Sequence, residues 1–369
     1  MPKVSETTLE INLASLKHNF EYLKSKLQKN TLFLAVVKAF AYGSDAEVIA
    51  KTLQEIGADY FAVAYISEGV ALRKAGIKTP ILVLHPQLNN LSLAIEHCLE
   101  PSLYTLKILK EFNRVAKKLN QKNYPVHIKF NTGLNRLGFE ANELDLVAEQ
   151  FSKTTALRVK SVFSHLAASE DLEEKEFTLN QIELYKSLST AFVGKLGHPV
   201  IRHLCNTSGV LNYPDAHFDM VRCGIGLYGY GNSNKETQNF RPIATLKSII
   251  SQIHIVTKGK SVGYNRGFIS PNGSKIATIP IGHADGIGRH FGHGVGFVSV
   301  AHKKAPIVGN VCMDMVMVDV TAIDCEEGDE VVLFGPDLSA EASAETANTI
   351  SYELITGISQ RVKREILKK

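Results

Sequence analysis

Lys38 is the first residue whose type and position could carry chemistry. It closes the apolar run from Leu32 to Val37, and an amine at the end of a buried strand is costly unless it is paired or reactive, because burial penalises its charged form. A lysine with a pKa lowered by burial can form a Schiff base with a carbonyl group. An exposed lysine at a strand end is the simpler interpretation, so Lys38 needs support from other residues.

Two later segments carry groups that bind phosphate. One contains Asn206 and Thr207, which supply an amide and a hydroxyl, and the other contains Gly224 and Ile225, where small residues leave backbone N–H groups accessible. A reactive lysine together with a phosphate site favours an aldehyde cofactor with a phosphate group, namely pyridoxal 5'-phosphate. A phosphosugar aldolase remains an alternative.

Further polar residues follow other strand-like runs. Lys129 ends one run and leads into a loop whose single arginine is Arg136, and His165 and Arg222 close two later runs. His165 alone could be a satisfied core histidine, but a histidine near an arginine and a lysine at a strand end favours a functional role.

These residues can act together only in a fold that brings the ends of several strands to one place, and the sequence pattern predicts such a fold. Short β-rich runs alternate with helical segments such as 46–56, 67–75, 106–119 and 181–195, after an N-terminal strand at 8–12 and a helix at 13–27. Eight such runs in about 200 residues predict an α/β fold, a (β/α)8 TIM-type barrel with its chemistry at the C-terminal strand ends. The runs are 32–38, 60–64, 80–85, 101–104, 126–131, 159–165, 200–206 and 219–224.

The alternation stops near Gly229, and a second domain is predicted after it. Residues 230–240 are polar and read as a linker, and the following strands come without long helices. We therefore expect three parts: an N-terminal strand over residues 1–11 that packs with the C-terminal domain, a barrel over 12–230 that binds pyridoxal phosphate, and a mainly β C-terminal domain over 241–369. The expected later elements are strands at 243–256, 275–281, 296–300, 305–311, 315–320 and 330–334, a helix at 342–354 and a solvated basic tail at 361–364.

Composition narrows the class of protein. The 369 residues are 44% hydrophobic and 21% charged, which excludes a disordered chain. The net charge of +4 argues against a nucleic-acid partner. No apolar run reaches a membrane-spanning length, the first ten residues lack a signal-peptide pattern, and five scattered cysteines favour free thiols. We expect a cytoplasmic enzyme for a small-molecule substrate.

Two other motifs have weaker structural context. The segment from Gly224 to Gly229 fits the spacing G-x-G-x-x-G, but a polar linker follows it instead of a helix, which disfavours a dinucleotide site. His283, His290 and His293 lie in a Gly-rich stretch without the spacing of zinc ligands on one element, so no metal is expected.

Taken together, these motifs resemble bacterial alanine racemase, a pyridoxal-phosphate family with a barrel followed by a β domain. The segment AVVKAFAYG around Lys38 resembles the family's cofactor-lysine signature, and the similarity extends almost end to end. The other matching segments are 129–138, His165, 206–207, 222–228, 262–264, 282–286, the Cys-Met-Asp segment 312–314 and the short tyrosine motif 350–353.

The resemblance implies two bases. Lys38 would hold the cofactor and act as one base, and Tyr264 from the β domain of a partner subunit would act as the other. Removing a proton from one face of Cα and returning it to the opposite face requires a base on each side. Arg222, acting through His165, would make the tyrosine a better base.

The resemblance also implies the remaining contacts. Arg222 would face the pyridine nitrogen and leave it unprotonated, because arginine does not release its proton. Arg136 would contact the phenolic oxygen of the cofactor and the substrate carboxylate, and the amide of Met313 from the partner would bind that carboxylate. Lys129 is expected as a carbamate. The expected cofactor-binding set is Lys38, Tyr42, Arg136, His165, Asn206, Thr207, Arg222, Gly224, Ile225 and Tyr352.

Several positions depart from the family pattern and leave substrate breadth open. Phe40 stands where asparagine is usual, Thr207 where serine is commoner, His283 where a tyrosine lines the entrance, Asn310 where an arginine is often found, and Lys363 where a proline stands. The expected reaction is the interconversion of L-alanine and D-alanine by a homodimer with shared sites, supplying D-alanine for peptidoglycan.

The alternatives are a racemase of broader range, a decarboxylase on the same barrel type and a non-catalytic pyridoxal-phosphate carrier. The decarboxylase would use a cysteine such as Cys312. The carrier is disfavoured by the second domain, because such proteins consist of a single barrel.

Overall fold

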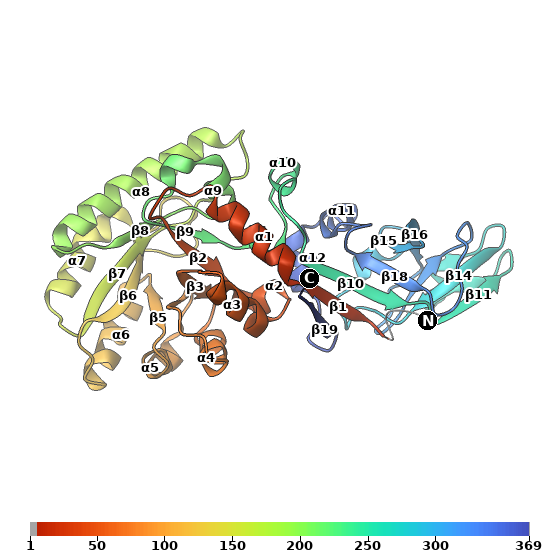
Figure 1. Cartoon of the computed structure of the whole chain (residues 1–369), viewed down its shortest axis with the longest axis horizontal. Helices are drawn as coiled ribbons and strands as arrows, with labels where there is room; N and C mark the ends of the chain where they lie inside the picture. The colour runs from red at the N-terminus through yellow and green to blue at the C-terminus, as the bar shows by residue number, and fades with distance from the viewer. Residues whose placement is uncertain (1–5, 369) are drawn as a thin grey trace. The chain divides into compact units, whose positions relative to one another are not determined.

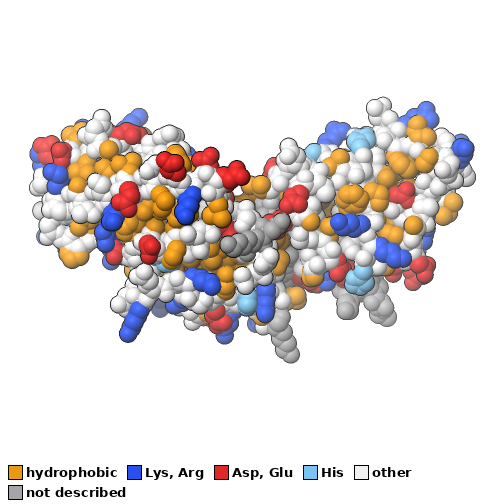
Figure 2. All heavy atoms as spheres, turned by 90° about the horizontal axis from the view of Figure 1, so that it is seen from above, with side chains coloured by type: hydrophobic (Ala, Val, Ile, Leu, Met, Phe, Trp, Pro, Cys, Tyr) orange, Lys and Arg blue, Asp and Glu red, His pale blue; other side chains and the backbone are white. Residues whose placement is uncertain are grey.

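The computed structural model describes residues 6–368, and of residues 234 and 235 it describes the backbone alone. Residues 1–5 and 369 of the expected domains therefore lie outside the described residues. The chain divides into two compact units. The barrel unit contains residues 17–41 and 46–240, and the β unit contains residues up to 16, 42–45 and 241 onward. Basic and acidic side chains are interspersed on the face shown in Figure 2.

The barrel unit is built on a closed sheet of eight parallel strands (Figure 1). Most residues of these strands are buried and apolar, as expected for parallel strands covered on both faces. The (β/α)8 fold expected from the alternating pattern is confirmed. The strands are β2 (Leu32–Val36), β3 (Tyr60–Val63), β4 (Ile81–Val83), β5 (Glu100–Leu103), β6 (Tyr124–Lys129), β7 (Leu157–Phe163), β8 (Ile201–His203) and β9 (Met220–Cys223).

Helices follow the barrel strands and cover them (Figure 1). Most ends lie within one or two residues of the predicted ends, but α8 begins six residues earlier than expected. The bounds are α1 (Leu13–Lys24), α3 (Ala46–Glu55), α4 (Ile66–Lys74), α5 (Leu91–Glu96), α6 (Leu106–Lys118), α7 (Leu144–Ser152), α8 (Lys175–Leu196) and α9 (Thr207–Asn212).

The predicted linker has structure of its own. It contains the short helix α10 (Asn234–Thr237), and Glu236 within it is buried. The Glu236 carboxylate accepts hydrogen bonds from the Ser208 hydroxyl at 2.9 Å and from the Asn212 amide at 2.8 Å. A buried carboxylate needs such donors, and they attach the linker to the end of the barrel unit.

The β unit contains a nine-stranded sheet, which confirms a mainly β second part. Its order is β11-β14-β17-β16-β15-β18-β10-β1-β19, so β1 (Thr8–Asn12) lies between β10 (Ala244–Ile249) and β19 (Lys363–Leu367). The β1 strand pairs antiparallel with β10 and parallel with β19. The other strands are β11 (Gln252–Val256), β14 (Ser274–Ile279), β15 (Phe297–Val300), β16 (Lys303–Val308), β17 (Val316–Asp319) and β18 (Glu330–Phe334), and the small pair β12 (Ser261–Val262) with β13 (Phe268–Ile269) is separate.

Three sequence predictions in the β unit were wrong. The single strand expected at 243–256 is two strands, β10 and β11, that lie far apart in the sheet order. The single helix expected at 342–354 is α11 (Ala340–Thr346) and α12 (Ser351–Thr356), interrupted where Asn348 takes φ of 53°. The basic tail is not simply solvated, because the Arg364 guanidinium donates to the carbonyls of Gly43 at 2.8 Å and Ile358 at 3.0 Å.

Candidate active site

Lys38 lies two residues after β2, at the C-terminal mouth of the barrel. It is half-buried, and burial, aided by the positive charge of Arg136, lowers the pKa of its amine, while Glu68 acts in the opposite direction. The backbone before it is fixed because the Tyr228 hydroxyl donates to the carbonyl of Val36 at 2.8 Å. The amine is thus held in surroundings that favour its neutral, nucleophilic form.

The chain leaves Lys38 through a left-handed turn. Residues 39–42 all have φ between 52° and 55°, and this turn is labelled α2 (Lys38–Tyr42) in Figure 1. The left-handed region costs an L-residue roughly 1–2 kcal/mol, and four consecutive residues there mark a strained segment of the kind found at functional sites. The Ala39 N–H donates to the Glu68 carboxylate at 2.7 Å, which helps to hold the turn. The residue pattern gave no sign of this conformation.

Arg222 at the end of β9 is buried and donates several hydrogen bonds. It donates to the carbonyls of Ser164 at 2.6 Å and Leu204 at 2.9 Å, and its two Nη atoms lie 3.0 Å from Nδ1 of His203 and 3.1 Å from Nδ1 of His165. Burial lowers the pKa of Arg222 to about 10, so the side chain stays cationic at neutral pH. The predicted pairing of Arg222 with His165 is present in the structure, and the partner His203 was missed.

His165 is a neutral imidazole of defined tautomer. Burial and the neighbouring cations, Arg222 first, hold its pKa well below the ordinary value of 6.5. Because arginine can only donate, Nδ1 of His165 must accept the hydrogen bond, and the ring proton is therefore on Nε2. His165 consequently offers an N–H donor on the side opposite Arg222.

Lys129 and Arg136 add positive charge to the same mouth. Lys129 is buried, and burial together with the charges of Arg136, Arg222 and Lys38 lowers its pKa to about 8. Arg136 is exposed on the following loop. Gly138 closes that loop with φ of 135°, where a Cβ atom would lie 2.5 Å from the backbone nitrogen of Asn131. The loop shape therefore depends on glycine at this position.

The predicted phosphate residues of the barrel lie close together. The Thr207 hydroxyl accepts hydrogen bonds from the N–H groups of Gly224 at 3.3 Å and Gly226 at 3.4 Å. Ile225 is buried beside them. Asn206 caps α9 by accepting from the Gly209 N–H at 2.9 Å, so its predicted cofactor contact is accompanied by a structural role. Because the Thr207 hydroxyl accepts from both amides, its own proton can be donated to a ligand, and a hydroxyl donor beside a glycine-rich backbone suits a phosphate.

The remaining candidates belong to the β unit. The rings of Tyr42 and Tyr352 are 6.0 Å apart between centroids. Tyr264 and Met313, which belong to two different loops, are 74% and 60% exposed. The Asn310 amide donates to the carbonyl of Tyr264 at 2.9 Å, and the Ala284 N–H donates to the carbonyl of Met313 at 3.0 Å. Both loops thus have fixed backbones while their candidate side chains are open to solvent.

Within the barrel unit, the residues fit pyridoxal phosphate. An amine of lowered pKa, a buried cationic arginine and a hydroxyl-and-amide corner all lie at the same end of the strands. Such a set matches the aldehyde, the ring nitrogen and the phosphate of that cofactor.

Comparison with known proteins gives a consistent result. The family model described as "Alanine racemase, N-terminal domain" matches residues 11–232, and "Alanine racemase, C-terminal domain" matches residues 243–366. The chain is 36% identical over 371 residues to "Alanine racemase 2" of Caldanaerobacter subterraneus subsp. tengcongensis, covering 98% of this chain and 95% of the relative. It is 37% identical over 372 residues to "Alanine racemase" of Halothermothrix orenii, with 98% and 97% covered.

Solved structures resemble the whole chain as well. An alanine racemase from Clostridium difficile superposes with a TM-score of 0.92 at 32% identity, covering 99% of this chain and 97% of the other. An alanine racemase from Bartonella henselae, described with covalently bound pyridoxal phosphate, gives a TM-score of 0.90 at 29% identity, covering 99% and 100%.

Proposed function

The chain belongs to the alanine racemase family of isomerases, and we propose that it interconverts L-alanine and D-alanine with pyridoxal 5'-phosphate. The observation that carries the proposal is the amine of Lys38, whose pKa is lowered at the same barrel mouth as the buried Arg222. The family's usual role is to supply D-alanine for peptidoglycan, and the five free thiols fit a reducing, cytoplasmic setting.

Lys38 would hold the cofactor covalently. The Bartonella henselae relative reported above is described with covalently bound pyridoxal phosphate. Thr207, Gly224 and Ile225 would bind the phosphate from the barrel, and Tyr42 and Tyr352 would bind it from the β unit. Arg222 would face the pyridine nitrogen. When bound, the cofactor withdraws electrons from the amino acid and makes its Cα–H acidic.

Two residues of this chain would move the proton. Lys38, whose pKa is lowered by burial, can take a proton from one face of Cα as a neutral amine. Tyr264 would give and take a proton on the opposite face. The Nε2–H of His165, oriented by Arg222, would donate to a phenolate oxygen and so increase the fraction of Tyr264 in its deprotonated, basic form.

Arg136 and the Met313 amide would bind the substrate carboxylate. Arginine suits this task because its planar donors match a carboxylate. Arg136 is exposed on a loop of defined shape, so it is available to a substrate carboxylate.

We propose a homodimer in which Tyr264 and Met313 serve the barrel of the other subunit. Both side chains are largely exposed, although they lie on loops with fixed backbones. Reciprocal contribution by two subunits gives a two-fold dimer with two identical composite sites.

We further propose that Lys129 is carbamylated. The charges of Arg136 and Arg222 lower the pKa of its amine, so as an ammonium ion it would be repelled by two neighbouring arginines. The neutral amine can attack CO₂, forming an N–C bond and releasing one proton to solvent. The resulting anion would attract the cations that the ammonium repels.

The deciding experiment incubates the purified chain with the cofactor and a panel of L-amino acids. The proposal is supported if D-alanine forms from L-alanine faster than any other L-amino acid of the panel is converted to its D-isomer. Comparable rates with serine or basic amino acids would indicate a racemase of broader range. Release of CO₂ without D-alanine would indicate a decarboxylase, although burial raises the pKa of the Cys312 thiol and so disfavours its thiolate.

A further inference from the structure

Three polar side chains are enclosed in the core of the barrel. His127 on β6, Ser161 on β7 and His203 on β8 have no solvent exposure. His127 and Ser161 are register partners across β6 and β7, and Ser161 faces the start of β8. Apolar residues fill most of this core, and burying polar groups among them is unfavourable unless they bond to one another.

The three side chains form one continuous row of hydrogen bonds with a charged residue at each end. His127 Nε2 is 2.8 Å from the Glu100 carboxylate, and its Nδ1 is 2.5 Å from the Ser161 hydroxyl. The same hydroxyl is 2.7 Å from Nε2 of His203, whose Nδ1 is 3.0 Å from Arg222. We call these five side chains the barrel relay.

Both ends of the barrel relay demand the same direction of donation. Arg222 can only donate, so Nδ1 of His203 accepts and its proton is on Nε2, which donates to Ser161. At the other end an ionised Glu100 can only accept, so His127 donates from Nε2 and accepts at Nδ1 from the Ser161 hydroxyl. A doubly protonated His127 would direct a second donor at Ser161 and leave the hydroxyl proton without an acceptor, so the neutral form satisfies the row.

Glu100 is the only carboxylate of the barrel relay, and its position is separate from the cationic mouth. Within residues 6–368, none of the hydrogen-bond partners of Arg222 is a carboxylate. The Tyr60 hydroxyl lies 3.4 Å from Glu100. The negative charge of Glu100 also acts to raise the pKa values of Arg73 and Tyr124. The relay therefore connects a buried cation to an anion through three neutral side chains.

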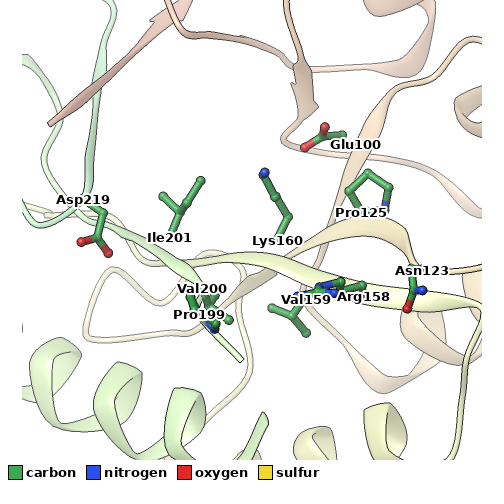
Figure 3. A pocket seen from close by; sticks show the side chains of 10 residues that line it. All are labelled: Glu100, Asn123, Pro125, Arg158, Val159, Lys160, Pro199, Val200, Ile201 and Asp219. Carbon is green, nitrogen blue, oxygen red and sulfur yellow. The ribbon is translucent and has the colours of Figure 1, made fainter. Parts of the chain in front are cut away.

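Glu100 is also where the relay reaches water. It lines a pocket of about 640 Å³ at the N-terminal ends of the barrel strands, together with Lys160, Ile201 and Asp219 (Figure 3). The Glu100 side chain is 13% exposed. This pocket lies at the mouth of the barrel opposite to Lys38, because Glu100 and Ile201 begin their strands whereas Lys38 follows the end of β2.

We infer that Glu100 is a positioning residue that acts through the barrel relay on Arg222. Its carboxylate fixes the proton arrangement of His127, Ser161 and His203, so that His203 presents a lone pair to Arg222 and holds the guanidinium in place. The consequence for catalysis rests on the proposed function, because it assumes that Arg222 faces the cofactor. The relay itself is a property of this chain.

Nitrogen NMR of the full-length, cofactor-loaded protein with ¹⁵N-labelled histidine tests the proton arrangement. We expect His127 and His203 to have a protonated Nε2 and an unprotonated Nδ1, with signals assigned by their loss in H127N and H203N. Ser161→Ala should shift the signals of both rings, whereas Ser189→Ala, a buried serine outside the relay, should leave them unchanged. The opposite tautomer at either ring, or no response to Ser161→Ala, would overturn the inference.

A double-mutant cycle tests whether the two ends act on each other. Glu100→Gln keeps an acceptor but removes the charge, and we expect it to lower the melting temperature by roughly 2–4 °C. In an Arg222→Gln background, Glu100→Gln should lower the melting temperature by less than half as much, because the relay that joins the two residues is already broken. Without such a connection, the effects of two distant substitutions would simply add. Exposed Glu149→Gln should be additive with Arg222→Gln.

Additive effects of Glu100→Gln and Arg222→Gln would refute the coupling. If Arg222→Gln fails to fold, the histidine signals in Glu100→Gln decide instead: a shift at His203, three side chains away, supports the relay, and a shift confined to His127 refutes it. Neither readout depends on turnover. If the wild-type chain forms no D-alanine, the proposed function is refuted and the inference about the relay still stands. If the chain is an active racemase and the two substitutions are additive, only the inference about the relay is refuted.

Discussion

The candidate residues of the barrel unit and those of the β unit differ in how they are held. Arg222 and Thr207 are enclosed, and the half-buried His165 is bonded to Arg222, whereas the Tyr264 and Met313 side chains extend from ordered loops into solvent. The charges and hydrogen bonds around the barrel residues thus come from the barrel unit itself. The exposed side chains of the β unit can make such contacts only when another surface covers them.

This difference separates two kinds of substitution. Changing an enclosed residue removes hydrogen bonds that the folded chain needs, so activity and stability should fall together. Changing an exposed residue removes contacts made only with ligand or partner, so activity should fall alone.

Lys38→Ala should have the largest effect on activity. The variant loses both the covalent anchor and one base, and we expect racemisation to fall by more than about 10⁴-fold, above the roughly 10²–10⁴-fold of a general base alone. Borohydride reduction followed by mass spectrometry should find the cofactor attached to the wild type and not to the variant. The exposed Lys78→Ala serves as the control. Full turnover in Lys38→Ala would disprove its assignment.

Tyr264→Phe should lower racemisation by about 10²–10⁴-fold, the contribution of one general acid–base group. The melting temperature should not change, because the ring is largely exposed. Loss of stability equal to that of an enclosed residue would contradict the comparison between the two units.

Mixing the two variants sharpens this prediction. In a dimer of one Lys38→Ala and one Tyr264→Phe subunit, a composite arrangement places both changes in one site and leaves the other site intact. Co-expressed subunits with different tags should therefore regain about half of the wild-type activity per purified mixed dimer. Mixed dimers without recovered activity would show that both bases come from one chain.

Arg222→Glu should affect activity and stability together. We expect racemisation to fall by about 10²–10³-fold, as for loss of a preorganised charged donor, and transamination to form a larger share of the products, because a carboxyl group can protonate the pyridine nitrogen. Unfolding should become easier, since the carbonyls of Ser164 and Leu204 lose their donor. Exposed Arg136→Gln should lower activity while preserving the melting temperature. Unchanged product partition would remove Arg222 from the nitrogen site.

Thr207→Val should weaken cofactor binding by about 10- to 100-fold, because a hydrogen bond to a charged group contributes about 1.5–3 kcal/mol. Thr207→Ser keeps the hydroxyl and should bind within a factor of about two of wild type. Spectroscopic titration of the cofactor-free variants measures both constants. Equal affinity of the valine and serine variants would exclude the hydroxyl from the phosphate site.

Lys129 should give the smallest effect, one that depends on pH. Its pKa of about 8 lies below the ordinary value of 10.5, so its charge destabilises the fold fully below about pH 8, and the penalty disappears as pH rises toward 10.5. In CO₂-free buffer at pH 7.5 we expect Lys129→Met to melt roughly 2–4 °C above the wild type, with the difference shrinking as the pH rises from 8 toward 10.5.

Bicarbonate provides the complementary measurement for Lys129. It should raise the melting temperature of the wild type and leave Lys129→Met unchanged, and intact mass should increase by one CO₂. A wild type that gains neither stability nor mass in bicarbonate would exclude the carbamate.

The sequence predicted the barrel because apolar runs and helical segments alternate with a regular period, a signal that each element carries by itself. It also brought Arg222, His165 and Thr207 to one mouth, since parallel strands end together. The left-handed turn after Lys38 could not be predicted, because Ala39 and Phe40 have no preference for that region. Asparagine, the family's usual residue at position 40, tolerates it better.

Long-range pairing accounts for the other misses. The split between β10 and β11 depends on strands that arrive later in the chain. His127, Ser161 and His203 belong to three strands, and their contact depends on barrel register rather than on any local pattern. The presence of a histidine or serine within each of three runs predicted as barrel strands was the signal that could have found them.

The position of β1 between β10 and β19 determines when the large sheet can form during synthesis of the chain. This strand is synthesised roughly 230 residues before its neighbour β10, and β19 follows later still. At roughly 5–20 residues per second, β1 waits for tens of seconds with both edges unpaired. The barrel unit can close while the chain is still growing, whereas the β unit can be completed only when β10 and β19 have been synthesised. We expect the yield of this protein to depend more on chaperones that shield the unpaired β1 strand than on the folding of the barrel.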